Sequence, residues 1–317
     1  MEILKKSVNT NCLIIPVYNN EKSINILLEK INKIHEKLNN DLEVLFIVDG
    51  SPDNCYEILK KNLPKQKYAS KIILLSRNFG ELNAIRTGLQ VAKGDYFASM
   101  SADLQEPIEL VINFFNTLKN EPVDVVVGVR ESRDDPVFTK IFAIVFWYLY
   151  KKFIIKELPK GGVDVFGCNK LFRDTLVKLK ESNSSLIGQI FWIGFRRKEI
   201  LYKRLKRNFG FSQWTFRKKI NYMLDSVFSF SDLPVKILTI IGSFGVLFFG
   251  ISGILAIISK LMGLIDVPGW ASLFLSIGII GAINILSLGL IGSYVWRIYE
   301  NTKDRPLSII LKIDEYN

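Results

Sequence analysis

Asp103 and Gln105 are the two residues whose types and spacing point most directly to chemistry. They follow an apolar run, Tyr96 to Met100, that reads as a buried strand, and Pro107 is well placed to begin a helix. In an open parallel α/β sheet, ligands bind outside the carboxyl ends of the strands. A carboxylate and an amide oxygen in one short loop can hold a hard divalent cation, Mg²⁺ or Mn²⁺, whose other positions are filled by water and substrate phosphate oxygens. The alternative is that both are ordinary turn and capping residues before a helix.

Apolar runs alternate with helical periodicity over the first part of the chain. The runs predict strands over residues 12–18, 42–48, 72–75, 96–100 and 123–129, with helices between them. This alternation predicts a mainly parallel α/β sheet with right-handed crossovers and helices on both faces. Neither Gly-x-Gly-x-x-Gly after the first strand nor Gly-x-x-x-x-Gly-Lys occurs, so dinucleotide and P-loop phosphate cradles are excluded. We interpret one sheet edge as the active site, because the strands deliver polar residues there: Tyr18, Asp49, Asn78, Asp103 and Arg130.

The composition indicates a basic protein that meets a membrane. The formal net charge is +11 and 49% of the residues are hydrophobic, which does not suit an ordinary soluble enzyme. Nucleic acid is not expected as a partner, because the apolar excess lies in two C-terminal segments that a nucleic-acid binder does not need. Cys12, Cys55 and Cys168 have no paired spacing, so neither a disulfide framework nor a zinc site is indicated. His35, the only histidine, is expected on the solvated face of a helix.

Two C-terminal segments, Val235–Ser259 and Trp270–Trp296, are each long and apolar enough for a transmembrane helix. Together they predict a hairpin, and cations at both outer ends predict a multi-pass protein of the inner (plasma) membrane with its catalytic domain and both termini in the cytoplasm. Cations and aromatic residues over 202–220 favour an amphipathic helix on an anionic leaflet. Glycines on the spans suit a homo-oligomer or, equally, lipid-facing anchors. The predicted organisation is a catalytic domain over 1–210, an interfacial junction over 211–233, two spans (235–259 and 270–296) within 234–297 and a tail over 298–317.

Three stretches carry a resemblance to a known family. Residues 101–107, Ser-Ala-Asp-Leu-Gln-Glu-Pro, resemble the Asp-x-Asp-Leu-Gln-x-Pro loop of family 2 glycosyltransferases of the GT-A fold, specifically the branch that makes polyprenyl-phosphate sugars. Ser101 stands where that pattern has its first Asp. Residues 16–19 resemble the opening Pro-x-Tyr-Asn of the family, and residues 47–53 resemble its Val-Asp-Asp-Gly-Ser-x-Asp segment, with Asp49 alone in place of the pair.

The resemblance implies a GT-A fold and a hexosyltransferase. The implied reaction moves a sugar, with inversion, from a nucleotide sugar, expected to be a UDP-sugar, to undecaprenyl phosphate, giving a polyprenyl-phosphate sugar for modification of cell-envelope glycans. Asp103 and Gln105 would hold the Mg²⁺ or Mn²⁺, Arg130 and Arg133 would bind the acceptor phosphate, and Asp164 would orient the attacking oxygen, so Asp103 and Asp164 are the implied catalytic residues. The residues implied in donor binding are Pro16, Tyr18, Asp49, Asn78, Ser101 and Asp103.

Other readings stay open at this point. Asp49 can instead cap the next helix, and Arg130 and Arg133 can belong to a solvated charged loop. A polysaccharide-extending glycosyltransferase is disfavoured because the chain lacks a Gln-x-x-Arg-Trp acceptor motif. A catalytically inactive membrane scaffold is the hypothesis from another class, in which Ser101 and the single Asp49 mark the loss of activity. A scaffold should show no metal-dependent affinity for a nucleotide sugar.

Overall fold

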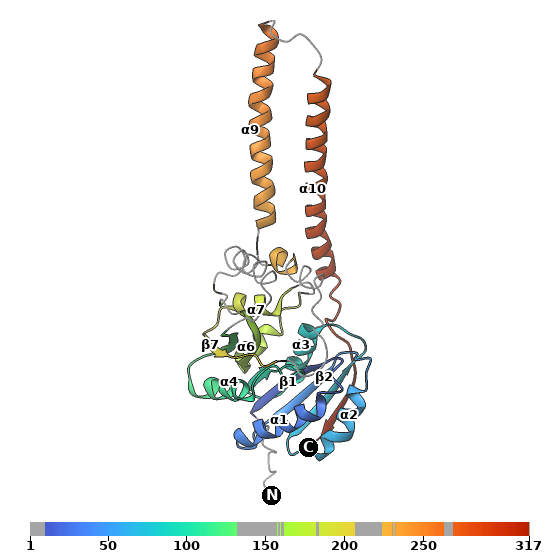
Figure 1. Ribbon diagram of the computed structural model, residues 1–317, viewed down its shortest axis with the longest axis vertical. Helices are drawn as coiled ribbons and strands as arrows, with labels where there is room; N and C mark the ends of the chain where they lie inside the picture. The colour runs from blue at the N-terminus through green and yellow to red at the C-terminus, as the bar shows by residue number, and fades with distance from the viewer. Residues whose placement is uncertain are drawn as a thin grey trace.

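Eight strands form one mixed sheet (Figure 1). The computed structural model describes residues 10–131, 157, 159, 162–181, 184–206, 224–229, 231, 233–262 and 269–316. β1 pairs in parallel with β2 and β4, β2 with β3, and β5 with β7, whereas β6 and β8 run antiparallel to their neighbours. In spatial order the strands are β7 (Arg197–Tyr202), β5 (Val125–Arg130), β6 (Val163–Asn169), β4 (Tyr96–Ser99), β1 (Asn11–Val17), β2 (Glu43–Val48), β3 (Ala69–Leu75) and β8 (Ile310–Tyr316).

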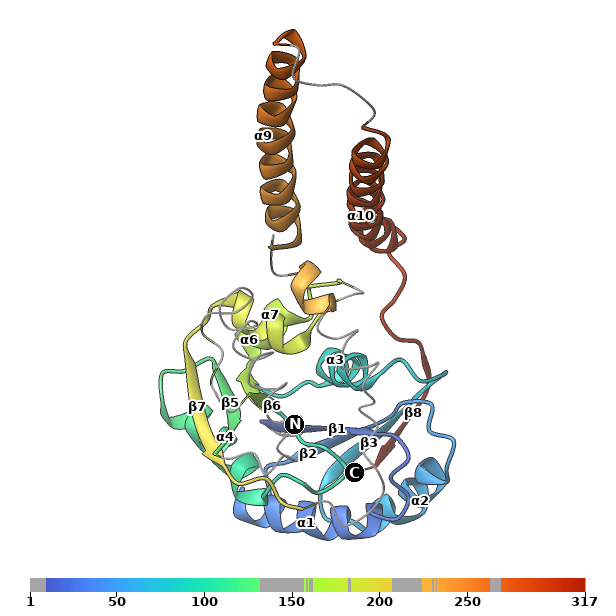
Figure 2. The same ribbon diagram turned by 45° about the horizontal axis from the view of Figure 1, so that its top comes forward.

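Helices cover both faces of this sheet (Figure 2). One face carries α1 (Ile24–Lys37), α2 (Cys55–Asn62), the 3₁₀ turn η1 (Leu63–Lys65) and α4 (Ile108–Asn120); the other carries α3 (Glu81–Val91), α6 (Lys170–Leu176) and α7 (Leu186–Ile193). Alternate residues of each strand enter the two cores. Leu13 and Ile15 of β1 pack with α1 and α4, while Ile14 between them packs with α3. Because both faces are covered, the inner strands β1, β2, β4 and β5 are mostly apolar and buried, and the predicted sheet and helix layers are confirmed.

His35 corrects one expectation. It is 5% exposed and its ring lies edge-on to that of Tyr68, with centroids 6.0 Å apart. Burial lowers the pKa of this imidazole. His35 lies one turn beyond Ile31 on the apolar side of α1. The lysines and glutamate beside it in the sequence indicated a solvated position, so its burial was not expected.

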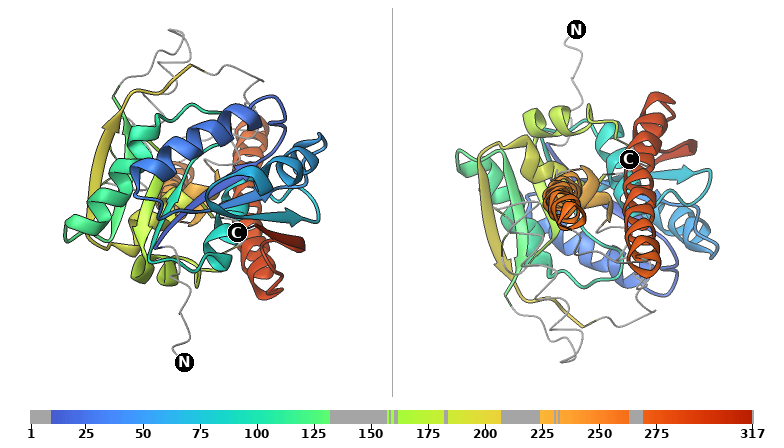
Figure 3. Two further views of the ribbon diagram at one scale, coloured as in Figure 1. Left: turned by 90° about the horizontal axis from the view of Figure 1, so that it is seen from below. Right: turned by 90° about the horizontal axis from the view of Figure 1, so that it is seen from above.

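The end of the chain also differs from the prediction. Residues 298–317 were expected to form a tail outside the catalytic domain, but α10 continues to Thr302 and β8 then joins the sheet beside β3. β8 and β7 are the outermost strands on the two sides of the sheet (Figure 3). The Lys71 ammonium joins β8 to the inner strands, at 3.2 Å from Glu315 Oε1 and 3.3 Å from Glu43 Oε1. The sheet therefore contains residues from both ends of the chain.

Two long helices, α9 (Leu233–Leu261) and α10 (Trp270–Thr302), project from the domain side by side (Figure 1). Within the described residues, one segment is long and apolar enough by composition to cross a membrane, Ile279–Thr302 of α10. The apolar stretch identified in α9 by the same test, Pro234–Gly245, is shorter. The two helices lie where the hairpin was predicted, but a multi-pass arrangement is not supported, because only one candidate span is found in the described residues.

A short helix over residues 224–229 lies against the domain end of α10. Arg297 of α10 donates a hydrogen bond to Asp225 Oδ1 at 2.7 Å and lies 5.0 Å from the centroid of the Phe228 ring. Phe228 also meets Tyr294 edge-on. Most of the predicted interfacial junction, residues 211–233, lies outside the described part of the chain.

Candidate active site

The carboxyl ends of β1 to β5 meet at one edge of the sheet, since these five strands point the same way. Tyr18, Asp49, Asn78 and Asp103 lie in the loops that leave β1, β2, β3 and β4 there, and Arg130 is the last residue of β5. The sequence predicted this common edge. Side-chain contacts divide it into a β1–β3 region, a loop after β4 and a cluster at β5, β6 and β7.

The Asp49 carboxylate stabilises the loop that leads from β3 into α3. The carboxylate is 2% exposed and accepts hydrogen bonds from the backbone N–H groups of Phe79 at 2.7 Å and Gly80 at 2.9 Å. Asn78 Nδ2 donates to the Asp49 carbonyl oxygen at 3.2 Å. Burial raises the pKa of the Asp49 carboxyl against the effect of these bonds. Asp49 therefore fixes Phe79 and Gly80, the two residues that lead into α3, and a donor-binding role for Asp49 and Asn78 stays a prediction.

The loop after β1 is held by the loop after β2. Asn19, at a positive φ of 59°, donates its backbone N–H to Ser51 Oγ at 2.7 Å, and the Glu21 N–H donates to Asp53 Oδ2 at 3.0 Å. Tyr18 directly precedes this turn and its side chain is half-buried, while Pro16 is paired with Ile47 inside the sheet. The contacts position Tyr18 at the edge, and its donor role, like that of Pro16, stays a prediction.

The loop after β4 (residues 101–106) folds back on itself; we call it the donor loop because the sequence predicts donor and metal ligands there. Leu104 has a positive φ of 64°, and Asp103 Oδ1 accepts from the Gln105 N–H at 3.3 Å. This turn brings Glu106 back to Ser101, whose N–H, at 3.1 Å, and hydroxyl both donate to Glu106 Oε2. Glu106 is 1% exposed, and burial raises the pKa of its carboxyl to about 7 against the effect of the Ser101 hydroxyl. Glu106 was not predicted as a site residue, and its one signal in the sequence is an acid directly before Pro107.

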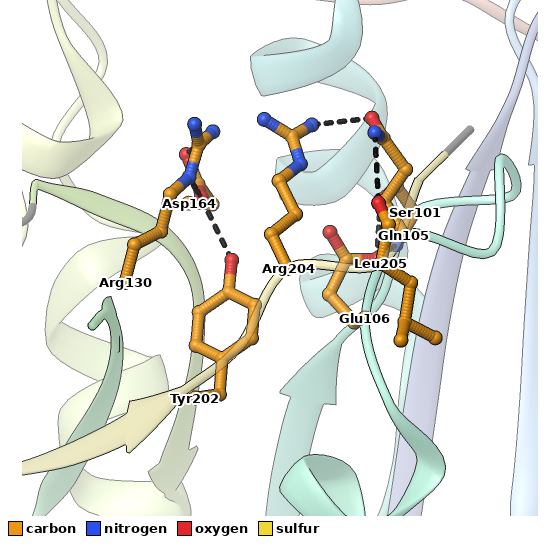
Figure 4. Close-up of polar contacts among 8 residues, drawn as sticks. All are labelled: Ser101, Gln105, Glu106, Arg130, Asp164, Tyr202, Arg204 and Leu205. Atoms are coloured by element: carbon orange, nitrogen blue, oxygen red, sulfur yellow. Dashed lines mark hydrogen bonds and ion pairs between the residues drawn. The ribbon is translucent and has the colours of Figure 1, made fainter. Parts of the chain in front are cut away.

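The segment after β7 lies across the donor loop (Figure 4). Arg204 Nη2 donates to Gln105 Oε1 at 2.6 Å, the Leu205 N–H donates to the Gln105 carbonyl at 2.9 Å, and Gln105 Nε2 donates to the Leu205 carbonyl at 3.3 Å. The sequence indicated only a basic interfacial segment here. The structure instead brings the guanidinium of Arg204 into the candidate site.

Arg130, Asp164 and Tyr202 form the third region, which we call the acceptor cluster after the role that the sequence predicts for Arg130. Arg130 binds Asp164 through two nitrogens, Nε to Oδ2 and Nη2 to Oδ1 at 2.6 Å, and the Tyr202 hydroxyl donates to Asp164 Oδ2 at 2.7 Å. The side chains of Arg130 and Asp164 are 20% and 25% exposed. Burial, the largest single influence, raises the pKa of the Asp164 carboxyl, but Arg130, Tyr202 and Arg204 together outweigh it and hold that pKa below its usual value.

Three different strands bring this cluster together. β6 runs antiparallel to β5, so Asp164 near the start of β6 meets Arg130 at the end of β5, and Tyr202 ends the parallel β7. Arg133, predicted to share the acceptor role with Arg130, lies outside the described residues. Arg130 and Asp164 were predicted in separate roles, and the structure pairs them with each other.

The metal-ligating oxygens at this site suit a cation that is bound mainly by substrate phosphates. The described residues contain no group of three His, Cys, Asp or Glu side chains that could form a metal cage. Mg²⁺ is usually bound by one or two carboxylates together with substrate phosphates and water, and the half-buried Asp103 supplies one such carboxylate at the strand tip. Gln105 Oε1 already accepts from Arg204, so its role as a metal ligand stays a prediction.

The family model described as "Glycosyl transferase family 2" matches residues 12–179, which include β1 to β6, Asp103 and Asp164. The chain belongs to glycosyl transferase family 2. It is an α/β glycosyltransferase of the GT-A fold, as the resemblance implied. The match ends before Tyr202 and Arg204, so the segment across the donor loop lies beyond the family model.

Curated relatives extend the similarity over nearly the whole glycosyltransferase. A putative glycosyltransferase, CsbB, from Bacillus subtilis is 32% identical over 94% of this chain and 90% of its own length. The bactoprenol glucosyl transferase of Shigella phage SfII is 29% identical over 95% and 97% of the two chains. The undecaprenyl-phosphate 4-deoxy-4-formamido-L-arabinose transferase of Yersinia enterocolitica is 27% identical over 95% and 92%. The similarity therefore extends well beyond the residues that the family model matches.

Proposed function

We propose that this glycosyltransferase transfers a sugar, with inversion, from a nucleotide sugar to polyprenyl phosphate. The observation that carries the proposal is the meeting of a donor loop and an acceptor cluster at one sheet edge, with Arg204 on the segment between them (Figure 4). Relatives named for bactoprenol and undecaprenyl phosphate support the same acceptor class. A UDP-sugar is the proposed donor and undecaprenyl phosphate the proposed acceptor.

The donor diphosphate is proposed to lie over the donor loop. Asp103, with Gln105 once its oxygen is released by Arg204, would hold Mg²⁺ or Mn²⁺ there, and the cation would offset the charge of the leaving diphosphate. The Arg204 guanidinium would then turn from the amide oxygen of Gln105 to the diphosphate, because charge-assisted bonds to phosphate are stronger than bonds to a neutral amide. Tyr18, Asp49, Asn78 and Pro16 would border the nucleoside.

The acceptor phosphate is proposed to approach Arg130. Its oxygens compete with the Asp164 carboxylate for the same guanidinium, and Tyr202 keeps Asp164 in place. A phosphate oxygen attacks the anomeric carbon, the bond from that carbon to the diphosphate oxygen breaks, and the nucleoside diphosphate leaves with the bonding electrons. Since the acceptor phosphate is already largely ionised at neutral pH, Asp164 orients the attacking oxygen more than it removes a proton.

The acceptor lipid requires a membrane next to this edge. Ile279–Thr302 of α10 is the proposed span, and Arg297, Lys303 and Arg305 at its domain end favour the cytoplasmic side for the catalytic domain. Trp296 and Tyr299 lie beside Lys303, whose ammonium is 5.3 Å and 4.3 Å from the two ring centroids. Aromatic and basic residues at one helix end are typical of a membrane interface.

The test is transfer of label into lipid. Detergent-purified protein would be incubated with radiolabelled UDP-, GDP- and dTDP-sugars, undecaprenyl phosphate and Mg²⁺ or Mn²⁺, and label in the organic phase would be counted. We expect one donor to label the lipid, only when both metal and undecaprenyl phosphate are present. Folded protein that labels no lipid from any donor would contradict the proposal and favour an inactive scaffold.

A further inference from the structure

The hydroxyl of Ser101 is held by a buried acid. Ser101 is half-buried at the start of the donor loop, and both its N–H and its hydroxyl donate to the same oxygen of Glu106. A hydroxyl has one proton and two lone pairs. Because the proton is directed inward to Glu106, the lone pairs of Ser101 Oγ are left for a group on the outer side of the loop.

Glu106 is buried beside two charged groups. Its side chain is 1% exposed, and the charged groups that act on it are Asp103 of the same loop and Arg204 of the crossing segment. Figure 4 shows Glu106 between Ser101 and Arg204, with one carboxylate oxygen directed to each side. A buried carboxylate beside a second carboxylate is stabilised when a cation binds nearby.

We propose that Ser101 and Glu106 act as one unit in place of a carboxylate at position 101. The Ser101 hydroxyl, oriented and polarised by Glu106, is the oxygen ligand that joins Asp103 in holding the divalent cation of the donor diphosphate. Glu106 is a positioning residue, since it acts through Ser101. This inference rests on the proposed function and adds two residues to its metal site.

The local structure explains why the unit needs both members. Leu104 in the left-handed region turns the donor loop, so the carboxylate at 106 returns to the hydroxyl at 101. An aspartate at 101 would bring a second carboxylate against Glu106, with no hydroxyl proton between them. Second-shell carboxylates that accept a hydrogen bond from a metal ligand raise the basicity of that ligand, and their loss weakens metal binding by about 10- to 100-fold.

The experiment measures Mn²⁺ affinity by electron paramagnetic resonance, with the detergent-purified full chain and UDP, GDP or dTDP. The nucleotide that gives the tightest wild-type binding is used for all variants. We expect Ser101→Ala and Glu106→Gln each to weaken Mn²⁺ binding by about tenfold or more. The double variant should bind no more weakly than either single variant, because the two residues form one unit.

A rescue variant separates this role from simple support of the loop. Ser101→Asp combined with Glu106→Gln restores a carboxylate without a second one facing it, and we expect Mn²⁺ affinity to return towards that of the wild type. Thermal unfolding without metal checks the fold of each variant. If Glu106→Gln is unstable, Ser101→Ala at the half-buried position still decides the question.

Asp103→Ala distinguishes the two levels of the proposal. Loss of Mn²⁺ binding in Asp103→Ala together with wild-type affinity in Ser101→Ala would overturn the Ser101–Glu106 unit and leave the metal-dependent function standing. Wild-type Mn²⁺ affinity in Asp103→Ala would remove the metal site of the proposed function itself. Additive losses in the double variant would also overturn the unit.

Discussion

The donor loop and the acceptor cluster are built in different ways. The donor loop is local: residues 101–106 contact one another, with one left-handed residue, Leu104, making the turn. The acceptor cluster is non-local: Arg130, Asp164 and Tyr202 come from three strands and meet only when β5, β6 and β7 are in register. A contiguous motif can therefore be recognised in a sequence without the fold, whereas the acceptor cluster cannot.

The largest effect should come from the donor loop. We expect Asp103→Ala to lower kcat/KM for transfer by about 100- to 1000-fold, the range seen when one preorganised charge-stabilising group is removed from an active site. Asp95→Ala is the matched control, because Asp95 is an exposed acid before the other end of β4. Radiolabel transfer measures both variants. Comparable activity in Asp103→Ala and Asp95→Ala would show that Asp103 in the donor loop does not take part in transfer.

Arg130→Ala should act mainly on the acceptor. Removing one partner of a hydrogen-bonded charge pair costs about 2 kcal/mol or more, so we expect KM for polyprenyl phosphate to rise about 30-fold, with a much smaller change in KM for the donor. Arg196→Ala is the control. Arg196 makes the same two-nitrogen contact to Asp124, at 3.0 Å and 3.2 Å, at the opposite end of β5 and β7. Equal effects on both substrates would refute an acceptor role for Arg130.

Tyr202→Phe should have a smaller effect in the same direction. It removes one hydrogen bond to Asp164 and leaves the ion pair with Arg130, so about 1 kcal/mol, or about fivefold in KM for the acceptor, is expected. Tyr56→Phe is the control, since Tyr56 donates to Asp314 at the same 2.7 Å but next to β8, away from the site. If the two variants have equal kinetics, Tyr202 does not contribute to acceptor binding.

The smallest effect concerns acid stability. The pKa of Asp164 is lowered in the folded protein from its usual 3.8, so its ionised form stabilises the fold above that pH, and this contribution is lost as the pH falls through the folded-state pKa. The stability difference between wild type and Asp164→Asn should stay constant from neutral pH to about pH 5 and shrink below about pH 4. Thermal unfolding over a pH series measures it. A difference that grows on acidification would mean that the ion pair does not hold the cluster.

Sequence patterns identified the core sheet and one side of the site. Apolar runs predicted β1 to β5, because the central residues of each strand are buried on both faces and are therefore mostly hydrophobic. They did not predict the interior strand β6, where Asp164 and Gly167 interrupt the apolar pattern, or the edge strand β7, where Lys198, Glu199 and Leu201 are exposed. They also did not predict β8, the other edge strand, which is separated from β3 by more than two hundred residues. Edge strands lack the burial that makes a strand visible as an apolar run.

The contacts of individual polar residues were harder to predict. Asp49 was assigned to the donor from its motif, while in the structure its carboxylate binds the backbone N–H groups of Phe79 and Gly80, just before α3. Glu106, Tyr202 and Arg204 were overlooked as site residues, because a glutamate in a loop and cations beside aromatic residues are common in any basic chain. Tyr202 and Arg204 contact residues in other elements, and Glu106 meets Ser101 only because of the turn at Leu104. Spacing in the sequence does not predict such contacts.

The sequence by itself determined the family and the parallel core, and it predicted a site in the loop after β4, because these depend on contiguous residues and on periodic burial. Only the tertiary structure decided that Arg130 pairs with Asp164, that Arg204 reaches Gln105, and that the chain end completes the sheet. Side chains far apart in the chain meet through strand order and register, which are properties of the whole fold. The cluster of Arg130, Asp164 and Tyr202 thus exists only once the strands have paired.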